Sequence, residues 1–149
     1  MRRIAALLAV SAGLGVVLPA TPASAKPAEV KMVRTINNIR HAYGLPKLRP
    51  AYSLFVSARV YSRRMMRSDY FGHLSRIPVA SRWRAAGETI EWHSGWRLTP
   101  RKAVWRWMAS PPHRAVLLSR RFTRIGVGGA RGRYGRRMAT MWVAHVGRR

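Results

Sequence analysis

The spacing of apolar residues changes once along this 149-residue chain, and this change limits the possible folds more than any single residue does. Up to about residue 118, apolar side chains recur every three or four positions, which is typical of amphipathic helices. Further on, Ile125–Gly128 and Met138–Val146 are rich in β-forming residues and are separated by the turn-forming Gly132–Gly135. Helices followed by a hairpin predict the α+β class, with helices packed on an antiparallel sheet.

Five helical segments are expected before this hairpin. Met32, Ile36 and Ile39 share one face of the first helix, which ends at Gly44. The two prolines after Ser110 mark another helix start, because the N–H that proline lacks would have no partner in a first turn. This helix is expected to run from residue 111 to residue 118, and the three remaining helical segments are 51–68, 78–86 and 100–108.

The first 25 residues are predicted to be a secretory signal peptide. An apolar run from Ile4 to Leu18 follows a basic start, and Ala23-x-Ala25 fits the small-residue rule for cleavage. The run is shorter than the roughly 20 residues that span a bilayer, and no second run of that length follows. We therefore expect a mature domain over residues 26–149, without a transmembrane segment, that is secreted to the extracellular space or the cell envelope.

Composition excludes several kinds of site. The chain has no cysteine, so a disulfide scaffold, a thiolate metal site and a cysteine nucleophile are all ruled out. It carries 29 Lys and Arg against 4 acidic residues, for a formal net charge of +25, so anionic partners are expected. A hydrophobic content of 48% is too high for a solvated basic tail, and the mature chain is expected to fold as one domain.

Several short motifs follow one another in a set order between residues 33 and 146. They are Asn37-x-x-Arg40 with Gly44-Leu45-Pro46, Tyr70-Phe71-Gly72-His73, Gly87-Glu88, Trp107-Met108-x-Ser110-Pro111-x-His113-Arg114, and Phe122-x-x-Ile125-Gly126-Val127-Gly128, with a final aromatic strand at Trp142. This order resembles the CAP/SCP superfamily of cysteine-rich secretory and pathogenesis-related domains, especially its small bacterial secreted branch. The resemblance implies an α-β-α sandwich with a central antiparallel sheet.

The chain also departs from the family pattern. Thr89 follows Gly87-Glu88 where the family usually has Asn, and Ser110 stands where animal and plant members place a second Glu. The resemblance therefore brings His73, Glu88 and His113 to the family cleft but leaves its two-His, two-Glu tetrad incomplete. The disulfides of those relatives are also missing, as in the disulfide-free bacterial form.

Three interpretations of His73, Glu88 and His113 stay open. In a structural clasp, Glu88 accepts hydrogen bonds from both His rings and ties the loop after the second helix to the helix that begins at Pro111. In a metal site, two imidazoles and one carboxylate supply three ligands for a divalent metal such as zinc, against the unfavourable positive charge of the domain. In a catalytic site, Ser75 and Ser110 lie near the two histidines in sequence, but the two prolines after Ser110 leave poor oxyanion donors and no full mechanism is supplied. No catalytic residue is therefore assigned, and no cofactor is certain.

The other histidines carry weaker signals. His41 and His145 are expected in surface or packing roles, since a lone histidine is usually just accommodated. The segment 92–96, beside Glu91, is expected to be a loop whose tryptophans pack against the domain, with an aromatic rim of the cleft as the alternative.

The expected function is a secreted domain that binds lipid, glycan or other anionic cell-envelope material through the His/Glu cleft and a basic surface. Two alternatives stay open: a cleft hydrolase, with or without metal, and a cationic protein that acts by binding polyanions. The excess of Arg over Lys favours phosphate contacts, but the sequence has no motif for reading bases. No specific nucleic acid partner is therefore expected.

Overall fold

The computed structural model describes residues 25–75, 77 and 83–149. The predicted signal peptide, apart from Ala25, and residues 78–82 of the predicted 78–86 helix lie outside the described residues. The helices are α1 (Pro27–Ala42), α2 (Tyr52–Arg67), α3 (Pro100–Ala109) and α4 (Pro111–Leu118), and the strands are β1 (Arg49–Pro50), β2 (Ala85–Ser94), β3 (Arg124–Tyr134) and β4 (Arg137–Arg148). Within those ranges no helix has the length and apolar character needed to cross a bilayer.

The four strands form one sheet in the order β1-β3-β4-β2. The predicted hairpin is β3 and β4, and the turn between them lies at Gly135, whose φ of +56° suits glycine, so Gly132 belongs to the strand. β2 pairs antiparallel with β4, whereas the two-residue β1 pairs parallel with β3. The sheet is therefore mixed and not antiparallel throughout, because β1, which follows the turn after α1, runs in the same direction as β3.

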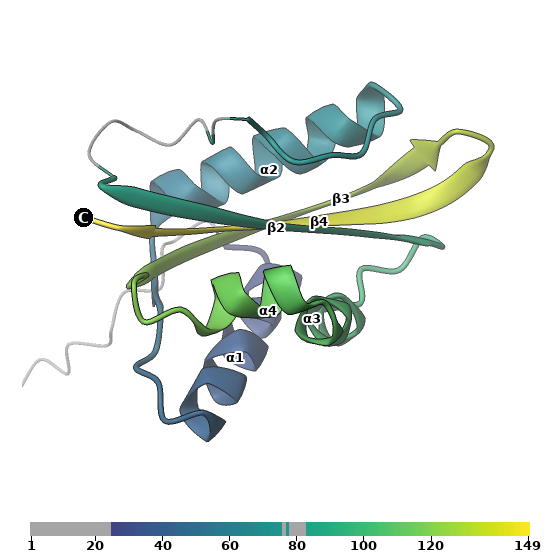
Figure 1. Cartoon of the computed structure of the whole chain (residues 1–149). Coiled ribbons are helices and arrows are strands. Elements are labelled where there is room, and N and C mark those ends of the chain that lie inside the picture. Colours follow the sequence, from purple (N-terminus) through teal and green to yellow (C-terminus); the bar gives the residue numbers. More distant parts are fainter. Residues whose placement is uncertain (1–24, 76, 78–82) are drawn as a thin grey trace, which may run out of the picture.

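The helices cover both faces of the sheet (Figure 1), as the α-β-α sandwich requires. α2 lies on one face and packs with a core cluster that includes Tyr61, Met65, Ile90 and Met141. α1, α3 and α4 lie on the other face, over a second cluster built around residues such as Trp107 and Trp142. The α+β class and the sandwich are confirmed.

Two glycines let α2 approach the sheet closely. A Cβ atom added at Gly126 would lie 2.1 Å from the backbone nitrogen of Phe55, and one at Gly128 would lie 2.3 Å from that of Arg59. Real Cβ atoms do not come so close to backbone atoms. The Ile-Gly-Val-Gly motif therefore serves packing: its glycines accept the helix, while Ile125 and Val127 fill the opposite core.

The strand β2 was not anticipated. It covers the end of the expected 78–86 helix and the start of the expected 92–96 loop, so both expectations are wrong for the residues it contains. A half-buried strand alternates apolar and polar residues, but β2 carries buried polar residues on both of its faces, Glu88 on one and Glu91 and His93 on the other. The sequence therefore lacks the period-two pattern that reveals most strands.

The Asn37-x-x-Arg40 motif braces the end of α1. The Asn37 side-chain amide exchanges two hydrogen bonds with the backbone of Leu48, at 2.8 and 3.0 Å. The fully buried Arg40 donates to the carbonyl oxygens of Leu117 at 2.6 Å and Ser119 at 3.0 Å, where α4 ends. Burial, with the nearby positive charge of Arg120, lowers the pKa of Arg40. This motif fixes α4, and α4 carries His113.

Candidate functional site

A buried carboxylate stands at the centre of the candidate site. Glu88 lies on β2, directly across the strand pair from His145 on β4. Its Oε1 atom accepts hydrogen bonds from His73 Nδ1 at 2.9 Å and from the Leu74 N–H at 3.1 Å. Its Oε2 atom accepts from His145 Nε2 at 2.9 Å. Glu88 therefore fastens the segment after α2 to the pair of strands β2 and β4.

These hydrogen bonds also keep Glu88 ionised. Burial alone pushes the pKa of the carboxyl group upward, because desolvation disfavours the charge. The hydrogen bonds from His145, His73 and the Leu74 N–H act against burial and outweigh it, and they hold the pKa of Glu88 below its ordinary value. Glu88 therefore acts as an acceptor, and each imidazole nitrogen that faces it carries a proton.

Two imidazoles meet at the solvent-facing end of this network. The His73 side chain is 53% exposed, and its Nε2 atom lies 3.4 Å from Nε2 of His113, in the first turn of α4. Because His73 uses its Nδ1–H toward Glu88, its Nε2 atom holds a lone pair in the neutral ring, and His113 Nε2–H donates to it. Burial, and then the proximity of His73, lower the pKa of His113. We call these two residues the imidazole pair.

The inner end of the network is held by an aromatic contact. The ring of the fully buried His145 stacks on Tyr61 of α2, with 6.5 Å between the ring centroids. The Tyr61 hydroxyl donates to the carbonyl oxygen of Gly72, next to His73. Burial, together with the charge of Glu88, raises the pKa of Tyr61 to about 12, so it stays a donor. α2 thus positions the segment that presents His73.

The structure brings the three predicted residues together, in an arrangement that differs from the expected clasp. Glu88 contacts His73 but not His113, which reaches the network only through His73. The second ring on Glu88 belongs to His145, which is buried as expected of a packing residue but is also part of the site. The pairing of β2 with β4 places His145 opposite Glu88. Because β2 was not predicted from the sequence, this partner of Glu88 was not predicted either.

The donor set accommodates a metal ion only in part. Two nitrogens bound to one tetrahedral zinc, each at about 2.0–2.1 Å, lie about 3.3 Å apart, close to the separation in the imidazole pair. Both oxygens of Glu88 are engaged by protein donors, so Glu88 would orient His73 rather than bind the metal. No three of the described His, Asp and Glu residues are grouped to hold a metal ion, and zinc binding stays a prediction.

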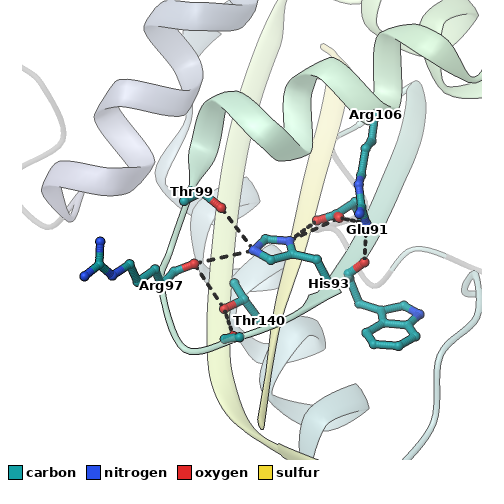
Figure 2. A network of polar contacts seen from close by, with 8 residues as sticks. Glu91, His93, Arg97, Thr99, Arg106 and Thr140 are labelled. Carbon is teal, nitrogen blue, oxygen red and sulfur yellow. Dashed lines mark hydrogen bonds and ion pairs between the residues drawn. The ribbon is translucent and has the colours of Figure 1, made fainter. Parts of the chain in front are cut away.

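A second polar network lies on the other face of β2 (Figure 2). The buried His93 faces both carboxylate oxygens of Glu91 through Nδ1, at 3.1 and 3.2 Å, and its Nε2 atom lies 3.0 Å from the Thr99 hydroxyl. Arg106 of α3 donates to Glu91 at 2.8 Å. Thr99 is the N-cap residue of α3, but its side chain makes no cap hydrogen bond because it turns toward His93. The network pins the start of α3 to the sheet.

Replacing Thr99 with valine should lower the free energy of unfolding by about 1–2 kcal/mol, because His93 Nε2 loses its hydroxyl donor in a buried position. Urea denaturation measures the loss. Thr99→Ser keeps the hydroxyl and should retain most of the stability. An equal loss in both variants would contradict a role for this hydrogen bond.

The acidic residues are used inside the fold, which leaves the surface basic. Glu29, Glu88 and Glu91 are buried, and the exposed Asp69 accepts a hydrogen bond from the Gly135 N–H. Among the Lys and Arg residues that the structure describes, Arg59 and Arg106 form ion pairs with a carboxylate. Apart from the buried Arg40, the other described Lys and Arg residues therefore leave the surface with positive charge that no carboxylate neutralises.

Comparison with known proteins places these features in a family. The family model of the cysteine-rich secretory proteins (CAP) matches residues 33–146. The uncharacterized protein YkwD of Bacillus subtilis is 34% identical over 116 residues, which cover 72% of this chain and 44% of YkwD. The chain thus spans less than half the length of that relative.

Solved structures share the fold. An extracellular protein of Bacillus anthracis that contains an SCP domain superposes with a TM-score of 0.66 at 24% identity, over 88% of this chain and 45% of that one. An outer surface protein of Borrelia burgdorferi gives a TM-score of 0.64 at 20% identity, over 80% of this chain and 91% of that one. At these identities the likeness shows the fold.

Proposed function

Because the chain belongs to the cysteine-rich secretory protein (CAP) family, we propose that it is an exported protein that binds cell-envelope material at the imidazole pair of His73 and His113. One observation carries this proposal: two imidazoles face each other at the surface, and a buried carboxylate holds one of them from behind. Such preorganisation lowers the entropic cost of binding. The relatives named as extracellular or outer surface proteins support export.

The chemistry of the pair favours ligand binding over hydrolysis. His73 offers a lone pair at Nε2 with its orientation fixed by Glu88, which is the base half of a hydrolytic site. Among the described residues, however, no hydroxyl group is hydrogen-bonded to His73 or His113, and Ser110 carries no carboxylate to replace the family's second Glu. The pair therefore suits the binding of a ligand, with zinc as the cofactor that would be held at the two Nε2 atoms.

Binding to envelope fractions tests the proposed function. Wild type should bind membrane or wall fractions at both about 50 mM and about 200 mM salt, because recognition at a fixed site outlasts the screening of surface charge. His73→Ala and His113→Ala should lower the salt-resistant binding by at least about tenfold. His41→Ala, which removes an exposed histidine of α1, should leave it unchanged. Binding that vanishes at high salt, and is unaltered in His73→Ala, would overturn the proposal.

Elemental analysis of protein purified without a His tag tests the metal separately. Zinc held at the imidazole pair would be found in wild type and in His41→Ala and would be lost in His73→Ala and His113→Ala, because each of these two variants removes one of the two nitrogen ligands. A site that stays empty at micromolar free zinc would rule out the zinc ligands while leaving metal-free envelope binding to the first experiment.

A further inference from the structure

Two adjoining hollows lie where β1 meets β3, away from the imidazole pair. The first has a volume of about 690 Å³ and is lined by Pro46, Lys47, Arg49, Thr123 and Arg124. The second, of about 280 Å³, is lined by Pro50, Ala51, Tyr52, Ser53, Trp83, Arg124 and Arg149. Arg124 borders both, and we call the two hollows together the β1 groove. β1 and β2, the strand of Glu88, are at opposite edges of the sheet.

The β1 groove collects positive charge without acidic partners. Lys47, Arg49, Arg124 and Arg149 line it, none of the described residues that line it is acidic, and none of these four forms an ion pair with a described carboxylate. Arg49 and Arg124 are also register partners on neighbouring strands. Two positive charges at one register position repel each other, so an anion bound between them would be favourable.

The side chains point to phosphate as that anion. A guanidinium group presents a planar set of donors that matches a phosphate in a bidentate manner, and Arg supplies three of the four charges. Basic side chains line both hollows, which suits several phosphate groups better than a single one.

The aromatic residues argue against a nucleic acid strand. Proteins that bind single strands without sequence preference stack successive bases on exposed aromatic rings. In the β1 groove Tyr52 is 62% exposed, but Trp83 is buried, and the Arg149 guanidinium lies 5.6 Å from the centroid of its ring. One free aromatic face does not make a stacking platform, so the groove fits a phosphodiester chain without bases.

We propose that the β1 groove is a second binding site, which takes a base-free phosphodiester chain of the polyol phosphate type through Arg49, Arg124, Lys47 and Arg149. This proposal does not rest on the imidazole pair. It gives the unpaired basic side chains of the β1 groove a role in binding. Phosphates bind in a row along the groove, with Arg124 shared between neighbouring groups.

Fluorescence anisotropy with a labelled poly(glycerol phosphate) oligomer tests this site in the full chain. Arg49→Gln/Arg124→Gln should weaken binding by at least about tenfold at about 50 mM salt, because it removes the paired arginines. The charge-matched control Arg63→Gln/Arg67→Gln, on the exposed face of α2, should weaken binding by less than about threefold. His73→Ala should bind like wild type. Thermal unfolding confirms that each variant is folded, and Lys47→Gln/Arg149→Gln provides a second groove variant, expected to show the same direction of change.

Three outcomes would overturn the proposal. Equal losses in the groove variant and the α2 control would mean that the oligomer responds only to net charge. If a single-stranded oligonucleotide with the same number of phosphates bound as tightly in the same assay, the groove would not prefer a chain without bases. Wild-type affinity in both groove variants would place the contact elsewhere.

Discussion

Replacing Gly128 with alanine is expected to destabilise the fold by more than about 3 kcal/mol, because the added methyl group meets backbone atoms of α2 rather than a flexible side chain. The added Cβ would lie 2.3 Å from the backbone nitrogen of Arg59 and 2.4 Å from the carbonyl carbon of Ala58, so α2 as a whole must move. Because backbone atoms cannot change rotamer, the collision is not relieved locally. Calorimetry or urea denaturation should show a large fall in stability.

Gly132→Ala is the matched control on the same strand. Its Cβ would meet only the Met66 side chain, at 3.1 and 3.4 Å, and a flexible methionine can shift by a few tenths of an ångström. Its cost should stay below about 1 kcal/mol. If Gly128→Ala proved no more harmful than Gly132→Ala, the close approach of α2 to β3 would be wrong.

The helices and the hairpin could be predicted because each carries its own local signal. Met32, Ile36 and Ile39 repeat at helical spacing, and the prolines after Ser110 mark the start of α4 whatever surrounds them. The two-residue β1 has no such signal, since its pairing depends on how the chain returns from α1 to the sheet. It is a tertiary effect, and it is what makes the sheet mixed.

The sequence predicted three residues that lie together in the candidate site, but not the contacts between their atoms. The motif resemblance brought out His73, Glu88 and His113, and these side chains do lie together. What the sequence does not reveal is which atoms meet, since that depends on the register of β2 against β4. His145 was overlooked for this reason, and so was the network around His93, which the expected loop at 92–96 concealed.

Removing the carboxylate of Glu88 is the second change with a large expected effect. Glu88→Ala should cost about 2–6 kcal/mol at neutral pH, roughly 1–3 kcal/mol for each donor, because it leaves His145 Nε2–H and the Leu74 N–H without their acceptor in or near the core. Glu88→Gln keeps the shape and one oxygen, but its amide NH₂ group cannot accept from an imidazole N–H. The Gln variant should therefore fall between wild type and Glu88→Ala in chemical denaturation.

The pH dependence separates the charge of Glu88 from its shape. The pKa of Glu88 is held below its ordinary value in the folded chain, so the unfolded chain binds the proton more readily. The resulting stability is fully present above the unfolded pKa of about 4.3, and it is lost as the pH falls through the lower folded pKa. With a chelator present throughout, wild type should lose stability more steeply than Glu88→Gln below about pH 4.3, since the amide has no proton to bind. If the free energy of unfolding fell equally steeply with decreasing pH in both proteins, the hydrogen bonds from His145 and His73 would not stabilise the ionised form of Glu88.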